Sequence, residues 1–154
     1  MRVHLYTNIF PHYRKSLWDS LISINDFDII FYFSNKSRQG LETVNVSNEY
    51  NSNSVKHFSK IRNIYIGKHI IWQVGVLKSL FNQNLKSAIF LAEMTIISTW
   101  IATIILKLKG IKVIYWGHGL YGNEKKLKKF FRLLFLSLAD HNLVYEKNSE
   151  KNLL

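Results

Sequence analysis

One histidine lies in a setting that suits acid–base chemistry. The stretch 112–122 reads KVIYWGHGLYG, so His118 stands between Gly117 and Gly119 directly after a short apolar run. Histidine exchanges protons near neutral pH, and it could take a proton from a sugar hydroxyl or donate a hydrogen bond to a phosphate. Glycine on either side lets a ligand approach the main chain closely. His118 is therefore the candidate catalytic residue.

Two further polar side chains follow apolar runs in the same way. Arg14 lies after the first apolar run and after Pro11, and Glu93 directly follows the run 88–92. A guanidinium can pair with a phosphate through two parallel hydrogen bonds, and a carboxylate can hold hydroxyl groups. Each residue alone has a structural alternative: Glu93 caps the next helix, and His118 is a turn residue bonded to backbone. Together, a base, a carboxylate and an arginine predict a substrate crevice.

The elements that would position these loops alternate between strand and helix patterns. Continuous apolar runs without a period of two are typical of strands covered on both faces. Such runs alternating with helical spacing indicate a doubly wound, Rossmann-like parallel sheet of the α/β class, forming one domain over residues 1–154. The carboxyl ends of its strands share one edge, where the three loops would meet. We expect strands at 3–6, 28–33, 61–66, 88–92, 113–116 and 141–145, and helices at 17–25, 70–81, 97–108, 124–139 and from 146 to the end.

Two segments carry more specific expectations. The polar connection from Ser34 to Lys60 has little periodicity, and an edge strand near 41–46 is one interpretation of it. The helix 97–108 is apolar over most of its circumference, so we expect it to be heavily buried and to end at Gly110. The apolar region 88–108 is interrupted by polar residues, which disfavours a membrane span.

Composition narrows the function classes. The chain has no cysteine, which excludes disulfides and zinc thiolates and, with no signal peptide, indicates a cytoplasmic protein. No phosphate loop or dinucleotide motif follows the first strand, and the six histidines show no metal-ligand spacing, so we predict no metal and no cofactor. The net charge of +11 fits nucleic acid, an anionic membrane or phosphorylated substrates, or else a solvated lysine surface. Aromatic residues and lysines are not interleaved, so we predict no nucleic-acid partner.

The helix predicted over 124–139 offers a second constellation. Its basic side, which we expect to face a membrane, is formed by Lys125, Lys128, Lys129 and Arg132. Its phenylalanine and leucine residues exceed what one packed face requires, which is typical of a helix lying on an anionic membrane surface. The alternative is an ordinary core helix with a solvated lysine face.

These residues resemble a known family. The pattern from Trp116 to Glu124, the loop 11–14 and the stretch 139–145 are similar to the amino-terminal domain of bacterial glycosyltransferases of the two-Rossmann GT-B architecture, family-4-like. The resemblance implies an acceptor-binding half that works with a nucleotide-sugar and a glycan acceptor, without metal, on the inner membrane face. It adds Tyr121 to the expected substrate-binding residues Arg14, Glu93, Gly117 and Gly119, where Arg14 and the two glycine amides face phosphate.

Two departures from the family shape the prediction. The first-strand loop lacks the glycine pair that many members carry, and the family's donor domain has no counterpart in these residues. We therefore expect a truncated frame or a separate donor-domain chain, and no turnover by this chain alone. The leading hypothesis is an acceptor domain in sugar transfer to a glycan or lipid-linked acceptor. The alternative is a non-catalytic module that docks on a membrane or partner through the helix 124–139.

Overall fold

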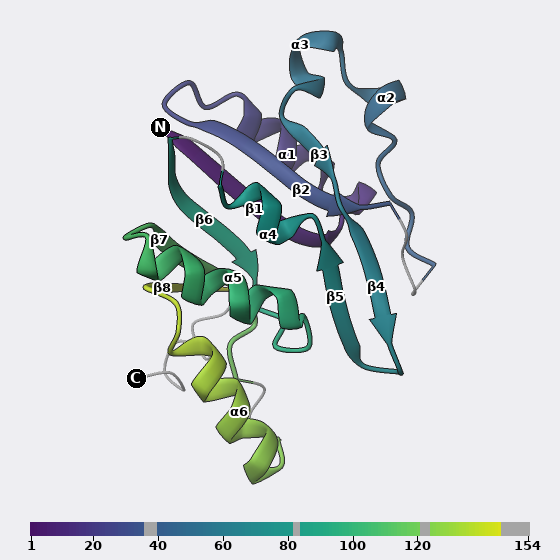
Figure 1. Ribbon diagram of the computed structural model, residues 1–154. Coiled ribbons are helices and arrows are strands. Elements are labelled where there is room, and N and C mark those ends of the chain that lie inside the picture. The colour runs from purple at the N-terminus through teal and green to yellow at the C-terminus, as the bar shows by residue number, and fades with distance from the viewer. Residues whose placement is uncertain (36–39, 82–83, 121–123, 146–154) are drawn as a thin grey trace.

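The computed structural model describes the chain except residues 36–39, 82–83, 121–123 and 146–154. Six strands form one sheet in the order β3-β2-β1-β6-β7-β8, and every neighbouring pair is parallel (Figure 1). This confirms an α/β protein with a parallel sheet, consistent with a Rossmann-like fold. The strands are β1 (Arg2–Ile9), β2 (Asp28–Ser34), β3 (Phe58–Lys60), β6 (Leu85–Leu91), β7 (Lys112–Gly117) and β8 (His141–Val144).

The strand order reverses beside β1. The chain builds outwards from β1 through β2 to β3, then returns to the other side of β1 with β6 and continues to β8. The point between β1 and β6 is therefore the topological switch point, where open α/β sheets leave a crevice. The helical segments are η1 (His12–Arg14), α1 (Lys15–Ile22), α2 (Val46–Glu49), α3 (Ser52–Val55), α4 (Val76–Ser79), α5 (Ile97–Leu108) and α6 (Lys126–Leu136).

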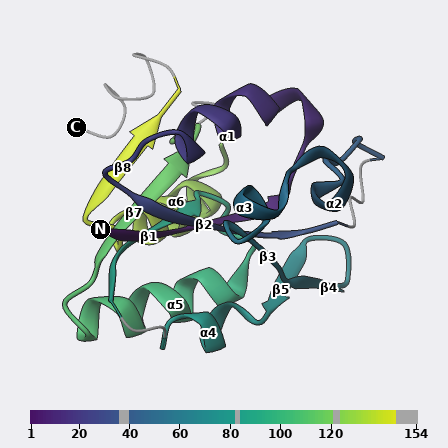
Figure 2. The ribbon, with the colours of Figure 1, turned by 90° about the horizontal axis from the view of Figure 1, so that it is seen from above.

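Both faces of the sheet are covered. Figure 2 shows α1 on one side and α5 on the other. In β1, Leu5 packs in the cluster that contains Trp18 of α1, and its neighbour Tyr6 packs in the cluster that contains Leu106 of α5. Successive side chains of a strand point to opposite faces, so burial of both explains the continuous apolar runs.

The predicted helix over 70–81 is wrong in its first half. Residues 70–74 form β5 (Ile70–Val74), which pairs antiparallel with β4 (Arg62–Ile66) in a separate two-stranded sheet. Positions four apart, such as Ile70 and Val74, share a face both in a helix and in a strand, so that spacing did not discriminate. The helix begins only after Gly75, whose φ of 102° ends the strand.

The suggested edge strand at 41–46 is also wrong. There, Thr43 forms only an isolated antiparallel bridge with Pro11, and the edge of the sheet is instead β3. Three residues of β3 pair with β2, Phe58 lying opposite Phe31. A strand this short gives almost no periodic signal.

The helix α5 has the predicted limits, but its burial is less complete than expected. Gly110 adopts a φ of 68° just after the helix, as a left-handed cap requires. One side of α5 is buried, whereas the other exposes Ile97, Ile101, Ile104 and Leu108. Among the described residues, no helix is both long and apolar enough to cross a bilayer. The helix predicted from residue 146 onward lies outside the described residues.

Candidate functional site

The three loops predicted to carry chemistry leave neighbouring strands at one edge. Arg14 follows β1, Glu93 follows β6 and His118 follows β7, and these strands are adjacent and parallel. Their register aligns Tyr6 with Phe90, and Phe90 with Tyr115. The loops therefore lie on the carboxyl edge beside the switch point. We call this edge, with Arg14, Trp116, His118 and Tyr145, the rim site.

Arg14 is held against aromatic rings. Its guanidinium carbon lies 4.9 Å from the centre of the Trp116 ring and 5.7 Å from that of Tyr145. Trp116 is supported from behind by Trp18, whose ring meets it edge-on at 5.9 Å. A cation over an aromatic face is attracted by the ring's negative face. The geometry thus keeps a positive charge at the end of β7, although Arg14 enters from the loop after β1.

His118 reaches the same aromatic residue. The His118 side chain is exposed, and its ring centre lies 4.7 Å from that of Tyr145. Tyr145 therefore contacts both Arg14 and His118, from the chain just after β8. Tyr145 is not among the site residues predicted from the sequence. The signal available was its position at the end of the strand predicted over 141–145, where the other strands also carry their site residues.

Glu93 is engaged in its own turn. Its carboxylate accepts a hydrogen bond from Thr95 Oγ1 at 2.9 Å, and its carbonyl accepts one from the Ile96 amide at 3.0 Å. The structure thus places Glu93 on the predicted edge and half-buried, while its carboxylate stabilises the turn that leads into α5. Arg14 and His118 are brought together by Tyr145. Glu93 joins them only by its position on the edge.

The two glycines around His118 have distinct structural reasons. A Cβ added to Gly117 would lie 2.7 Å from the Cβ of Ala92, so glycine allows the end of β7 to pack on the turn after β6. Gly119 adopts a φ of 68°, a conformation that side chains disfavour. Tyr121, the remaining expected substrate-binding residue, lies outside the described residues.

A hairpin that the sequence analysis did not expect adjoins the rim site. Gln73 of β5 donates through Nε2 to the Thr7 carbonyl and to Asn63 Oδ1, each at 3.1 Å. Asn63 of β4 in turn donates to the carbonyl and side-chain oxygens of Asn8, at 2.8 and 2.6 Å. The Ile71 amide also donates to the Thr95 carbonyl at 2.9 Å. These bonds attach the β4–β5 hairpin to the end of β1 and to the turn after β6.

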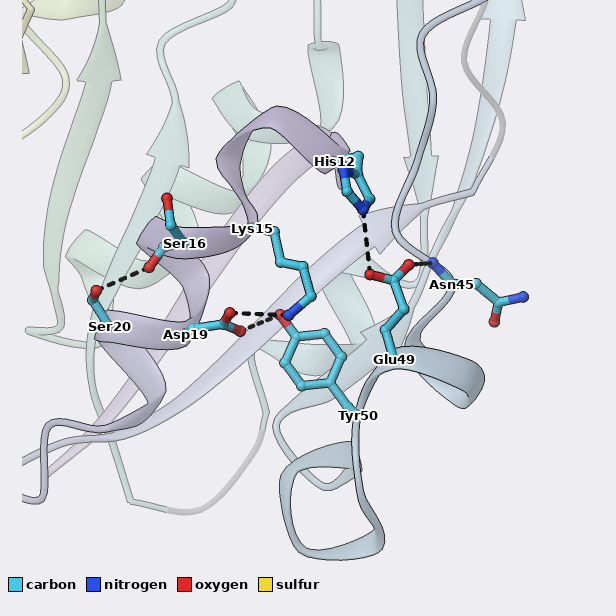
Figure 3. A network of polar contacts seen from close by, with 8 residues as sticks. All are labelled: His12, Lys15, Ser16, Asp19, Ser20, Asn45, Glu49 and Tyr50. Atoms are coloured by element: carbon cyan, nitrogen blue, oxygen red, sulfur yellow. Dashed lines mark hydrogen bonds and ion pairs between the residues drawn. The ribbon is translucent and has the colours of Figure 1, made fainter.

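A second polar network ties α1 to the segment that follows β2 (Figure 3). Asp19 accepts hydrogen bonds from Lys15 Nζ at 2.9 Å and from the Tyr50 hydroxyl at 2.7 Å, beside a cavity of about 300 Å³. Burial acts to raise the pKa of Asp19, but the bonds from Tyr50 and Lys15 outweigh it and lower that pKa below its usual value. His12 approaches Glu49 at 3.5 Å. Each carboxylate already has protein partners, so the role of this network is structural. It holds η1 and α1, the segments around Arg14, against residues 49–50.

The basic helix differs from the prediction at one residue. Lys125, Lys128 and Lys129 are exposed, as expected for residues facing a membrane. Arg132 is only 6% exposed, and its Nε donates to Glu124 Oε1 at 2.6 Å, so the prediction that it faces a membrane is wrong. A buried guanidinium needs a counter-charge, and Glu124, the acidic residue just before the helix, supplies it.

The fold and the rim define the chain as an α/β protein with a six-stranded parallel sheet, consistent with a Rossmann-like fold, and with a cationic, aromatic edge beside its switch point. Within the part of the chain that the structure describes, no group of three or more His, Cys, Asp or Glu side chains could hold a metal ion. Comparison of the chain with protein-family models, curated proteins and solved structures found no match.

Proposed function

We propose that this chain is the acceptor-side domain of a GT-B glycosyltransferase, which takes part in moving a sugar from a nucleotide-sugar to a glycan or lipid-linked acceptor. The observation that supports the proposal is the meeting of Arg14 and His118 on Tyr145 at the carboxyl edge. The doubly wound arrangement belongs to the proposal, and coverage of both sheet faces favours it.

Each rim residue has a role in this proposal that its chemistry can fill. Tyr145, which is 41% exposed, offers a ring face on which the C–H face of a sugar packs, and Trp116 holds Arg14 beside it. Arg14, already oriented by those rings, pairs with a phosphate of the ligand. His118, exposed at the same ring, accepts the proton of an acceptor hydroxyl. Glu93 hydrogen-bonds acceptor hydroxyls, and the amides of Gly117 and Gly119 face phosphate, with Tyr121 as a further contact.

The test measures transfer from a panel of sugar nucleotides, with a donor-binding domain supplied in trans. A positioned base contributes about 10²- to 10⁴-fold to rate, so His118→Ala should lose at least about 100-fold in transfer while ligand binding, followed by saturation-transfer NMR, persists. The matched control is His141→Ala, an exposed histidine at the start of β8, at the opposite edge. Full transfer by His118→Ala would remove the assigned role of that residue.

A second candidate function, membrane or partner docking through α6, is favoured by the exposure of that helix. Leu127 and Phe130 are 70% and 60% exposed, and Phe131, Leu133 and Leu134 are exposed as well. Large apolar side chains beside lysines suit an anionic lipid surface. Co-sedimentation with anionic vesicles tests this function. Binding that is lost on combining Lys128→Glu with Lys129→Glu, in a chain without affinity for sugar nucleotides, would favour docking over transfer.

A further inference from the structure

The β4–β5 hairpin exposes an apolar face. In an antiparallel pair, residues directly opposite each other share a face. The outer face of the hairpin, as we call it, comprises the opposed pairs Arg62 with Val74, Ile64 with Trp72, and Ile66 with Ile70. Ile66 is 56% exposed and Ile70 is 41% exposed, whereas Asn63, Gln73 and Ile71 on the inner face are buried. The hairpin therefore buries its polar network and presents isoleucines outward.

The hairpin and the sequence around it carry charges of one sign. The sequence from Tyr50 to Ala92 contains no aspartate or glutamate, but six lysine or arginine residues. Arg62 lies on the outer face itself, and Lys68 lies in the turn that joins β4 to β5. An exposed apolar patch marks a contact surface, and the basic residues Arg62 and Lys68 on the hairpin favour an anionic partner. The helix α6 also exposes large apolar side chains beside basic ones. In Figure 1 both α6 and the hairpin project beyond the ends of β1 and β6.

We propose that the outer face of the hairpin inserts into the interfacial region of an anionic lipid bilayer. Two protrusions from separate parts of the chain carry bulky apolar side chains flanked by cations. A bilayer, being both anionic at its surface and apolar beneath, satisfies both properties at once. The proposal does not depend on sugar transfer, and it concerns residues distinct from those of α6.

Trp72 makes insertion directly measurable. It lies on the outer face opposite Ile64 and is partly exposed, whereas Trp18 is fully buried. Vesicles of phosphatidylcholine with about 30% phosphatidylglycerol, carrying brominated acyl chains, should quench a component of the fluorescence on binding, because bromine quenches tryptophan only at short range. Trp72→Phe should remove that component. Lysine changes in α6 should weaken binding without removing the Trp72 component from the vesicle-bound fraction.

Affinity provides the second measurement. Replacing Ile66 and Ile70 together by glutamate places two charges where apolar contact is needed, and should lower vesicle partitioning by at least about tenfold. The matched control is Val55→Glu on α3, because Val55 is 39% exposed and lies outside the hairpin. Circular dichroism verifies that all variants fold. Wild-type partitioning by the double variant, quenching that Trp72→Phe leaves unchanged, or equal binding to pure phosphatidylcholine would each overturn the proposal.

Discussion

His4 should make the stability of this protein depend on pH in a defined window. The residue lies in β1 with no exposed surface, and its ring begins a chain of hydrogen bonds. Ser79 Oγ donates to the Val76 carbonyl at 2.6 Å, so it accepts from the Tyr6 hydroxyl at 2.7 Å. The Tyr6 oxygen therefore accepts from Nδ1–H of His4 at 3.0 Å. This assigns the proton of neutral His4 to Nδ1, and Nε2 has no partner among the described residues.

A second proton on His4 would have to bind Nε2, and the ring would then be charged. That N–H would be buried with no hydrogen-bond acceptor among the described residues. Burial lowers the pKa of His4 from 6.5 to about 4, with a further lowering by Arg2 and an opposing effect of Asp28. Because the folded pKa lies below the unfolded one, the unfolded chain binds more protons between these values. The free energy of unfolding is therefore fully present above pH 6.5, falls as the pH drops towards 4, and levels off below that. At about 1.4 kcal/mol per pKa unit, the fall is about 3 kcal/mol.

Urea denaturation at pH 7 and pH 4.5, followed by circular dichroism, measures this fall. His4→Asn keeps a donor near the position of Nδ1 but does not titrate, so its free energy of unfolding should lose far less over the same range than the wild type. Any cavity left by the smaller side chain lowers stability equally at both pH values and cancels from the comparison. His141→Asn, at an exposed histidine, should retain the full fall. An equal fall in His4→Asn and wild type would refute the reasoning.

Three further predictions concern close packing and buried polar contacts. Gly117→Ala should cost about 1–3 kcal/mol of unfolding free energy through its clash with the Ala92 Cβ, and combining it with Ala92→Gly should recover much of that loss in urea denaturation. Arg132→Leu should cost about 3–5 kcal/mol because it strands Glu124, and the double change with Glu124→Leu should cost less, as a double-mutant cycle would measure. Gln73→Leu should speed amide hydrogen exchange in the hairpin while the central strands keep their protection.

Local pattern was sufficient for the elements of the sheet. The apolar runs at 88–92 and 113–116 predicted two central strands correctly, because a strand covered on both faces is apolar at successive positions. The helix α5 was predicted with its limits because Gly110 supplies a clear stop. The parallel sheet then followed from the alternation of strands and helices. With it came the prediction that Arg14, Glu93 and His118 would share an edge.

The features that were missed depend on contacts between distant segments. Gln73 was assigned to a helix from the spacing of its apolar neighbours. Its hydrogen-bond partners, Thr7 and Asn63, come close to it only in the folded chain, so the local spacing carried no sign of the hairpin. Tyr145 became part of the rim only when β8 took its place beside β7. Arg132 was grouped with lysines by helical spacing, although Glu124 was the acidic residue available to neutralise a buried cation. For Gln73 and Arg132 the decisive quantity is the satisfaction of a buried polar group, which has no period in the sequence. For Tyr145 it is the pairing of β8 with β7, which is equally invisible in the local pattern.

The hairpin and the rim site are mechanically linked, and this gives a final prediction. Asn63 binds Asn8 just before the loop that carries Arg14, and Ile71 binds Thr95 two residues after Glu93. Because the inner face of the hairpin binds Thr7 and Asn8, insertion of its outer face would hold the rim site close to the bilayer surface. If both proposals hold, glutamates at Ile66 and Ile70 should reduce transfer to a lipid-linked acceptor in vesicles by about the loss in partitioning. Transfer to a water-soluble acceptor analogue should not change. An equal loss with both acceptors would mean that the hairpin shapes the rim itself, not its distance from the membrane.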